Sequence, residues 1–209
     1  DFDGDGSANS NQYDVGPVSD IDNSPNEIDE NGNYQLAGIT ASATDADAAN
    51  NTVTYSVTSD CNADSSQGSV CTFSIDSASG VVTADGGFDY ETASSHTIQV
   101  TATSSDGSTS SRSFTVQVND INEFDVGLIT DSDGFPNEVA ENATSGPVGI
   151  KASASDDDGS NNTVTYSLTS NPGNLFSIDA STGVVSALGP FDYEPATSHT
   201  IQVTATSSD

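Results

Sequence analysis

The sequence has almost no positive charge. Arg112 and Lys151 are its only Lys or Arg residues, against 32 Asp and Glu residues, so the formal net charge at pH 7 is −30. Binding to nucleic acid requires Lys and Arg contacts with phosphates, so this class of function is excluded. The same deficit argues against docking on an anionic membrane surface. No apolar run approaches the roughly 18 residues of a transmembrane helix, so we expect no membrane insertion.

Apolar residues are also scarce, at 33% of the chain, and the sequence contains no Trp and no Met. Low hydrophobicity combined with a high net charge can indicate disorder. Here, however, Val, Ile, Tyr, Phe and Ala occur in short alternating runs separated by Thr and Ser. This pattern is typical of an all-β protein with a small core. The acid-rich, Lys-poor composition favours an extracellular setting.

Cysteine is limited to Cys61 and Cys71. A metal site usually has more ligands nearby, and a redox pair more often has the spacing Cys-x-x-Cys. We therefore interpret the two residues as one disulfide that closes a short loop, which implies an oxidising compartment. Two free thiols are the alternative.

The chain is a tandem repeat. Residues 95–106 (SHTIQVTATSSD) recur unchanged at 198–209, an offset of 103 residues. Earlier in the chain, residues 50–56 (NNTVTYS) recur at 161–167 with an offset of 111. The difference indicates an eight-residue insertion in the first copy, in the stretch that carries both cysteines. Since the second copy closes the same turn without them, we expect the fold not to need the disulfide.

The repeat predicts an acidic N-terminal linker at residues 1–10, a first domain at 11–121 with the disulfide-closed insertion, and a second domain at 122–209. The second copy stops before a counterpart of residues 111–118 (SRSFTVQV), which we expect to form the last strand of the first. That strand either lies beyond residue 209 or is donated by another chain through β-augmentation.

Apolar and polar residues alternate with a period of two, which is the pattern of half-buried strands. About seven such strands in about 110 residues, with no helical period, predict an antiparallel β-sandwich of immunoglobulin-like size. The alternating apolar residues of the clearest strands are Ile39, Ala41, Ala43, Val53, Tyr55, Val57, Ile98, Val100, Ala102, Phe114, Val116 and Val118.

Asp and Glu cluster at the predicted loops rather than along strands. Two like charges about 4 Å apart repel by ~1 kcal/mol in water, and by more near a low-dielectric surface. Because Lys and Arg are so few, a divalent cation is the available counter-charge. Calcium prefers oxygen ligands, which these loops supply, and the lack of His and Cys disfavours zinc. The clustered acids are Glu30, Asp45, Asp47, Asp89, Glu91, Asp120, Glu123, Glu141, Asp156, Asp158, Asp192 and Glu194.

Five motifs occur in the same order in both copies: Glu-Asn, Asp-x-Asp followed by Asn and a Val-x-Tyr strand, Phe-Ser-Ile-Asp, Phe-Asp-x-Glu, and Val-Thr-Ala-Thr. Asp-x-Asn-Glu follows the first copy, at residues 120–123. This order resembles cadherin repeats, and most closely the bacterial cadherin-like repeats of large secreted proteins. The resemblance covers residues 25–123 and the second copy up to its last strand. It implies two tandem Greek-key β-sandwiches of the cadherin type, the second without its last strand in this chain.

In cadherins, calcium lies at the junction between consecutive domains, so the resemblance implies ligands from both copies and from the linker. The implied junction ligands are Glu30, Asp89 and Glu91 of copy one, Asp120, Asn122 and Glu123 of the linker, and Asp156, Asp158 and Asn161 of copy two, with Asn162 as the alternative to Asn161. The same motifs at the other end of each copy contribute Asp45, Asp47 and Asn50, and Glu141, Asp192 and Glu194.

The sequence departs from the family pattern at two equivalent positions. Ser104 and Ser207 stand where cadherins usually have Asp. Asp106 and Asp209 lie two residues further on and are candidate replacements. At the N-terminus, residues 1–6 (DFDGDG) resemble the start of an EF-hand loop, so this segment is either a calcium loop or a polar linker.

The resemblance implies a calcium-binding adhesion or spacer module, extracellular or at a cell surface, in a secreted bacterial protein. Its expected partners are neighbouring cadherin-like repeats or copies of the chain itself. Two alternatives stay open: a filament subunit completed by a donated strand, and a calcium-dependent module that binds surface polysaccharide. We expect no enzymatic activity, because no Ser-His-Asp spacing recurs around His96 and His199, which favours a structural role for both.

Overall fold

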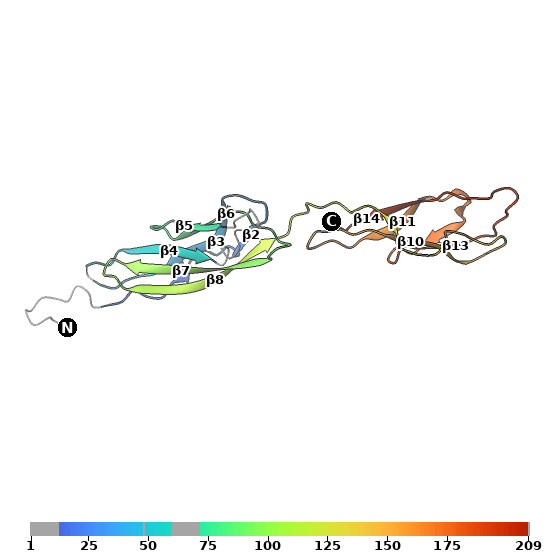
Figure 1. Ribbon diagram of the computed structural model, residues 1–209. Coiled ribbons are helices and arrows are strands. Elements are labelled where there is room, and N and C mark those ends of the chain that lie inside the picture. The colour runs from blue at the N-terminus through green and yellow to red at the C-terminus, as the bar shows by residue number, and fades with distance from the viewer. Residues whose placement is uncertain (1–12, 48, 60–71, 209) are drawn as a thin grey trace, which may run out of the picture. The chain divides into compact units, whose positions relative to one another are not determined.

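The computed structural model in Figure 1 describes residues 13–47, 49–59 and 72–208. Internal contacts divide the chain into two units, Asp1–Ile121 (domain 1) and Asn122–Asp209 (domain 2). The predicted Cys61–Cys71 disulfide, the acidic linker at residues 1–10 and its EF-hand-like start lie outside the described residues. The described part of the chain contains no helix with the length and apolar character that a membrane crossing requires.

Domain 1 is a sandwich of two four-stranded sheets, as the alternating pattern predicts. One sheet has the strand order β1-β3-β6-β5 and the other β2-β8-β7-β4. All pairs are antiparallel except β2 and β8, which run parallel. The strands are β1 (Ser19–Asp20), β2 (Glu27–Asp29), β3 (Gln35–Ser42), β4 (Val53–Ser59), β5 (Thr72–Ile75), β6 (Val81–Gly86), β7 (Ser95–Ser104) and β8 (Thr109–Asn119).

The core of domain 1 lies between these sheets. Every second residue of β7 points into it, and Ile98, Val100 and Ala102 are each 0% exposed. Phe114 and Val116 of β8 belong to the same buried cluster. Burying one such side chain stabilises the folded state by roughly 1.5–3 kcal/mol, so the period-two pattern is the main source of stability in this chain.

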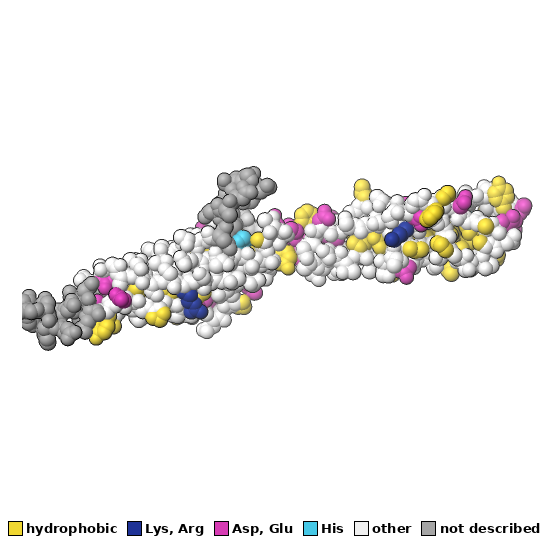
Figure 2. All heavy atoms as spheres, turned by 60° about the horizontal axis from the view of Figure 1, so that its bottom comes forward, with side chains coloured by type: hydrophobic (Ala, Val, Ile, Leu, Met, Phe, Trp, Pro, Cys, Tyr) yellow, Lys and Arg dark blue, Asp and Glu magenta, His cyan; other side chains and the backbone are white. Residues whose placement is uncertain are grey.

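Domain 2 repeats one sheet of domain 1 in full but only part of the other. The full sheet has the order β12-β13-β10-β9, whereas the second contains β11 and β14 alone among the described residues. Apolar side chains are visible on the surface of this domain in Figure 2. Its elements are β9 (Thr130–Asp131), β10 (Gly146–Ser153), β11 (Thr165–Ser170), the 3-10 turn η3 (Pro172–Asn174), β12 (Phe176–Ile178), β13 (Val184–Ala187) and β14 (Gln202–Thr206).

The turn η3 occupies the place of the eight-residue insertion of domain 1. The side chain of Asn171 closes it, because Asn171 Nδ2 donates to the carbonyl oxygen of Phe176 at 2.7 Å and Phe176 N donates to Asn171 Oδ1 at 3.2 Å. Two side-chain hydrogen bonds therefore hold this turn in domain 2 without a covalent link.

Equivalent glycines lie where a hairpin loop approaches strand β3 or β10. Gly80 and Gly183 have φ values of 76° and 71°. A Cβ atom at either position would lie 2.1 Å from a backbone carbonyl oxygen, that of Ala41 or of Ala152. Both the backbone conformation and the close approach therefore require glycine.

We expect Gly80→Ala to destabilise domain 1 by about 3 kcal/mol or more, because it adds a backbone clash to the cost of a positive φ. Gly107→Ala is the matched control: Gly107 also has a positive φ (98°), but no atom lies within 4 Å of the place that an added Cβ atom would take. This control should lose only about 1–2 kcal/mol. Denaturant unfolding of both variants measures the difference, and equal losses would contradict the steric explanation.

The same hairpin loops begin with an Asp that acts as a hydrogen-bond acceptor for the turn. Asp179 Oδ1 accepts from the hydroxyl groups of Ser181 (2.8 Å) and Thr182 (2.9 Å) and from the backbone N–H groups of both residues. These bonds, led by that of the Ser181 hydroxyl, lower the pKa of Asp179 from 3.8 to about 2. Asp76 occupies the equivalent turn of domain 1, and its pKa is lowered chiefly by the backbone N–H of Ser79.

A depressed pKa in the folded state contributes stability above the unfolded-state pKa, and this contribution is lost as the pH falls through the folded-state value. We therefore expect Asp179 to stabilise domain 2 fully above pH 3.8 and to lose this effect on the way down to about pH 2. NMR titration of its carboxyl carbon checks the pKa. In the double variant Ser181→Ala, Thr182→Ala the pKa should rise towards 3.8; an unchanged value would exclude the hydroxyl groups as the cause.

Candidate metal centres

Three carboxylates of domain 1 meet beside the ends of β2 and β8. Glu30, Asp89 and Glu91 each offer one oxygen atom, and these atoms lie within 4.8 Å of one another. Glu30 follows β2 directly, while Asp89 and Glu91 follow Phe88, whose ring is buried in the core. The side chain of Glu30 is only 2% exposed, although the other two carboxylates are exposed.

Backbone N–H groups hold the buried carboxylate of Glu30 in place. Tyr90 N donates to Glu30 Oε2 at 2.7 Å, and Ile121 N donates to Oε1 at 2.7 Å. The N–H of Glu30 itself donates to the carbonyl oxygen of Asn119 at 3.1 Å. Such charge-assisted bonds offset part of the cost of burying the charge. The chain that leaves β8 thus fixes this ligand candidate.

A second cluster of domain 1 contains Asp45, Asp47 and Asp106, whose oxygens also lie within 4.8 Å of one another. The structure thus brings the candidate replacement Asp106 to the two acids of the Asp-x-Asp motif. Ser108 N and its hydroxyl each donate to Asp106 Oδ1 at 2.7 Å. These bonds, led by the backbone N–H, lower the pKa of Asp106 and favour its charged form.

Ser104 has a different role from the aspartate that the family usually carries at its position. Its hydroxyl donates to the carbonyl oxygen of Asn50 at 3.1 Å. Asn50 has a positive φ of 58°, as does its counterpart Asn161 at 52°. In domain 2 the hydroxyl of Ser207 donates to Asn161 O at 3.3 Å. The two serines therefore stabilise the loops that contain Asn50 and Asn161. Sequence analysis missed this role, although a serine recurs at the equivalent position of both copies.

Two buried acids of domain 2 form the equivalent loop site. Asp156 and Asp158 are 9% and 2% exposed, and Asp158 N donates to Asp156 Oδ1 at 3.1 Å. Asp158 Oδ1 accepts hydrogen bonds from the backbone N–H groups of Glu123 (3.2 Å) and Phe124 (3.3 Å). The pKa of Asp156 is lowered, first by the hydroxyl of Ser207. The lowered pKa favours the charged form of Asp156 although its side chain is buried.

The choice between Asn161 and Asn162 is narrowed by one contact. The amide nitrogen of Asn162 donates to the carbonyl oxygen of Asp158 at 2.7 Å, and Asn51 makes the same bond to Asp47 in domain 1 at 2.9 Å. The Asn162 side chain is therefore used to stabilise the Asp-x-Asp loop. This use favours Asn161 over Asn162 as the ligand candidate.

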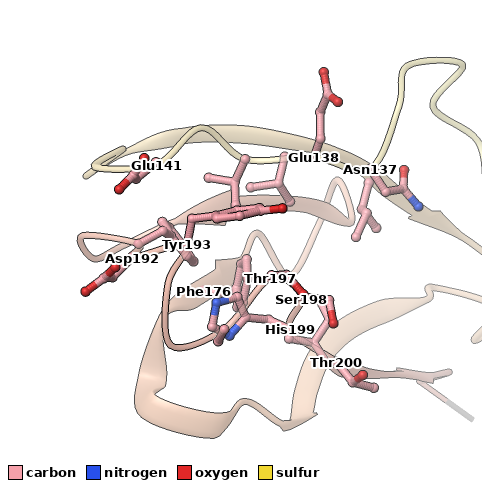
Figure 3. A pocket seen from close by; sticks show the side chains of 16 residues that line it. Asn137, Glu138, Glu141, Phe176, Asp192, Tyr193, Thr197, Ser198, His199 and Thr200 are labelled. Atoms are coloured by element: carbon pink, nitrogen blue, oxygen red, sulfur yellow. The ribbon is translucent and has the colours of Figure 1, made fainter.

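The last cluster, Glu141, Asp192 and Glu194, also lies within 4.8 Å, but all three residues are exposed. Figure 3 shows Glu141 and Asp192 at the same end of a pocket. Glu141 is the counterpart of buried Glu30, so an identical Glu-Asn motif has two different environments. The difference arises because residues 119–121 cover Glu30, whereas no described residue of domain 2 has that place.

Several of these acids fit a cation better than any partner the protein provides. Side-chain oxygens of Asp45, Asp120, Asp156 and Asp158 are buried without a hydrogen-bond partner. Burying an uncompensated carboxylate is costly. Of the two cationic side chains, Arg112 lies over the ring of Phe114, with 4.9 Å from its Cζ to the ring centroid. An all-oxygen donor set of this kind suits a hard cation such as calcium.

The predicted residues are therefore only partly assembled within each domain. Domain 1 gathers Glu30 with Asp89 and Glu91, and Asp45 with Asp47. Domain 2 gathers Asp156 with Asp158, and Glu141 with Asp192 and Glu194. Asp120 belongs to the end of domain 1, whereas Asn122 and Glu123 belong to the start of domain 2.

The two histidines pack as structural residues. The ring of His96 contacts that of Phe88 edge-on, with 5.4 Å between centroids, and His199 contacts Phe191 in the same way at 5.5 Å.

Comparison with known proteins places these features in a family. A family model described as the cadherin domain matches residues 25–119 and 135–209. Protocadherin Fat 4 from Homo sapiens is 36% identical over 172 residues, which cover 79% of this chain but 3% of that protein. The Homo sapiens protein named Cadherin EGF LAG seven-pass G-type receptor 2 is 33% identical over 143 residues, or 64% of this chain and 5% of that protein.

Solved structures share the fold at lower identity. The extracellular cadherin domains 3–6 of Protocadherin Gamma B2 align with a TM-score of 0.71 and 21% identity, covering 95% of this chain and 49% of that one. Mouse Cadherin-23 EC22–24 aligns with a TM-score of 0.65 and 22% identity, covering 95% and 60%. The relatives found are animal proteins, which corrects the expectation of a bacterial repeat protein.

We expect Glu30→Gln to destabilise domain 1 by about 2 kcal/mol in the presence of a chelator, because the amide turns an NH₂ group towards a backbone N–H that now donates to a carboxylate. Its counterpart Glu141→Gln should change stability by less than about 0.5 kcal/mol, because Glu141 is exposed. Denaturant unfolding measures both variants. A similar effect at the two sites would mean that the bonds from Tyr90 and Ile121 are unimportant.

Proposed function

Because the chain belongs to the cadherin family and consists of two tandem cadherin repeats, we propose that it is an extracellular adhesion or spacer module whose domains are linked by calcium ions. Cadherin repeats are generally calcium-dependent adhesion modules, are not enzymes, and typically bind calcium between successive repeats. One observation carries the proposal for this chain. Oxygens of Asp156 and Asp158 are buried without hydrogen-bond partners in a protein with 32 acids and two cationic residues.

The proposed ligands come from three segments of the chain. Each segment supplies acids or amides. The set is Glu30, Asp89 and Glu91 from domain 1, Asp120, Asn122 and Glu123 from the connecting segment, and Asp156, Asp158 and Asn161 from domain 2.

Electrostatic repulsion is the physical reason why calcium would stiffen the pair of domains. Without the ion, acids from three segments repel one another, and the connecting segment is free to bend. An ion that needs six to eight oxygens draws all three segments into one coordination shell. Extracellular calcium modules typically have dissociation constants on the order of 10⁻⁴–10⁻³ M, so extracellular calcium would occupy such sites.

The outer clusters extend the same proposal to neighbouring repeats. Asp45, Asp47 and Asp106 would bind calcium together with residues of a preceding repeat, and Asn50 belongs to the same loop as Asp45 and Asp47. Glu141, Asp192 and Glu194 would do so with residues of a following repeat or another copy. Adjacent repeats and copies of the chain are therefore the proposed partners. The polysaccharide-binding and filament-forming alternatives stay predictions.

Two neighbouring aspartates provide the sharpest test. Asp158 is 2% exposed, whereas Asp157 is exposed and belongs to no cluster. We expect Asp158→Asn to weaken calcium binding at least about tenfold in isothermal titration calorimetry, because it removes a ligand charge. Asp157→Asn removes the same charge from the same loop and should bind nearly as well as the unchanged chain.

Small-angle scattering of the same proteins measures the mechanical effect. Calcium should lengthen the unchanged chain and narrow its range of conformations, and chelation should reverse both effects. If Asp157→Asn and Asp158→Asn weaken binding equally, the ion is held by net charge rather than by this site. If shape and thermal stability do not respond to calcium, the proposal is wrong.

A further inference from the structure

The sequence contains three Asn-x-Thr motifs, the acceptor pattern for N-glycosylation, which begin at Asn50, Asn142 and Asn161. In this modification the side-chain amide of the Asn receives an oligosaccharide, and the hydroxyl group two residues later belongs to the recognised pattern. Asn50 and Asn161 lie in the Asp-x-Asp loops, which the calcium proposal uses. The motif at residues 142–144 (Asn-Ala-Thr) has no part in that proposal.

Asn142 lies in a tight turn that precedes strand β10. Its backbone N–H donates to the carbonyl oxygen of Phe191 at 2.8 Å, and Ala143 N donates to Ala140 O at 3.1 Å. Asn142 has a φ of 65°, a conformation that Asn tolerates better than most residues do. The side chains of Asn142 and Thr144 are both exposed. The fold therefore holds the backbone of this turn while it leaves the two recognised side chains of the motif accessible.

The side-chain amide of Asn142 is not used by the fold. Among the described residues, none accepts a hydrogen bond from it. Other amides of the chain do have such a role, since Asn51 and Asn162 donate to carbonyl oxygens of the Asp-x-Asp loops and Asn171 closes the turn at η3. A sugar attached to Nδ2 of Asn142 therefore breaks no hydrogen bond within the described part of the protein.

The equivalent turn is equally exposed in domain 1, where β8 completes the sheet. Its Asn31 N donates to Phe88 O at 3.2 Å, as Asn142 does to Phe191 in domain 2. The side chains of Asn31 and Asn33 are exposed. Accessibility is thus a property of the turn itself. Because residue 33 is Asn rather than Ser or Thr, domain 1 has the same turn without the glycosylation motif.

We propose that Asn142 is an N-glycosylation site. The proposal rests on the extracellular function proposed above, because this modification belongs to secreted proteins. In the transfer, Asn142 Nδ2 forms a bond to the anomeric carbon of an oligosaccharide that is carried on a lipid pyrophosphate. The bond between that carbon and the pyrophosphate oxygen breaks, the pyrophosphate leaves with the electron pair, and Nδ2 loses one proton.

The attached oligosaccharide lies next to one of the acidic clusters. Asn142 directly follows Glu141, whose carboxylate oxygen lies within 4.8 Å of those of Asp192 and Glu194. A glycan is bulky and hydrated, so it adds volume beside these acids without changing their charge. The modification therefore distinguishes this end of domain 2 from the equivalent end of domain 1, where the turn at Asn31 has no motif.

Secretion of the 209-residue chain from cultured animal cells, behind a cleavable signal peptide, tests the proposal. Thr52→Ala and Thr163→Ala remove the other two motifs and leave both of their Asn residues in place. In this background we expect a single glycan, detected as a loss of mass on treatment with peptide-N-glycosidase. The same treatment converts the modified Asn to Asp, and mass spectrometry of peptides should locate this change at Asn142. Because the signal peptide imposes the secretory route, the result does not depend on calcium binding or on the natural location of the chain.

Further variants in the same background identify the acceptor. Thr144→Ala should abolish the glycan, whereas Thr144→Ser should retain it. Ser145→Ala is the matched control, because it removes an exposed hydroxyl group one residue later and should leave the glycan in place. Asn33→Thr creates the motif in the exposed turn of domain 1 and should add a second glycan at Asn31. The proposal is overturned if the secreted chain carries no glycan, if Thr144→Ala retains it, or if Ser145→Ala loses it. A missing second glycan in Asn33→Thr would contradict the argument from the exposure of the turn.

Discussion

The pairing of β8 with β7 and β2 is the interaction on which most of domain 1 depends. Through its inward side chains β8 closes the core. Through its backbone it holds β2 in the sheet, since β2 pairs with no other strand among the described residues. The residues that follow it then cover Glu30 and donate a hydrogen bond to its carboxylate. One strand therefore determines the packing of the interior, the completeness of a sheet and the burial of a candidate metal ligand.

The second constraint is charge. With a net charge of −30, the protein cannot neutralise its acids with its own cations, and it orders several of them through backbone N–H groups instead. This arrangement fixes the carboxylate positions without cancelling their charge. The remaining negative potential of these carboxylates would attract a divalent cation. In the absence of an ion, repulsion between the carboxylates lowers the stability of the fold.

Sequence analysis predicts the all-β sandwich well because the core follows from alternation within single strands, as in Ile98, Val100 and Ala102. It also identifies the acidic loops, because each ligand candidate belongs to a short local motif. It fails where the environment comes from a distant segment. Glu30 and Glu141 share a motif but differ in burial, because residues 119–121 cover only Glu30. Likewise, nothing local distinguishes β7 from the shorter β14, or assigns Ser104 to the bracing of Asn50.

The identical segments 95–106 and 198–209 also impose a kinetic constraint on folding. During folding, β8 meets two edges with the same sequence, one in β7 and one in β14, so local affinity alone cannot select the correct partner. Chain connectivity selects it, because β8 is joined to β7 by four residues, whereas about eighty residues separate it from β14. The loop-closure entropy of that longer connection favours the native hairpin by roughly 2–3 kcal/mol. A tight turn thus protects a nearly duplicated protein from exchanging strands between its own repeats.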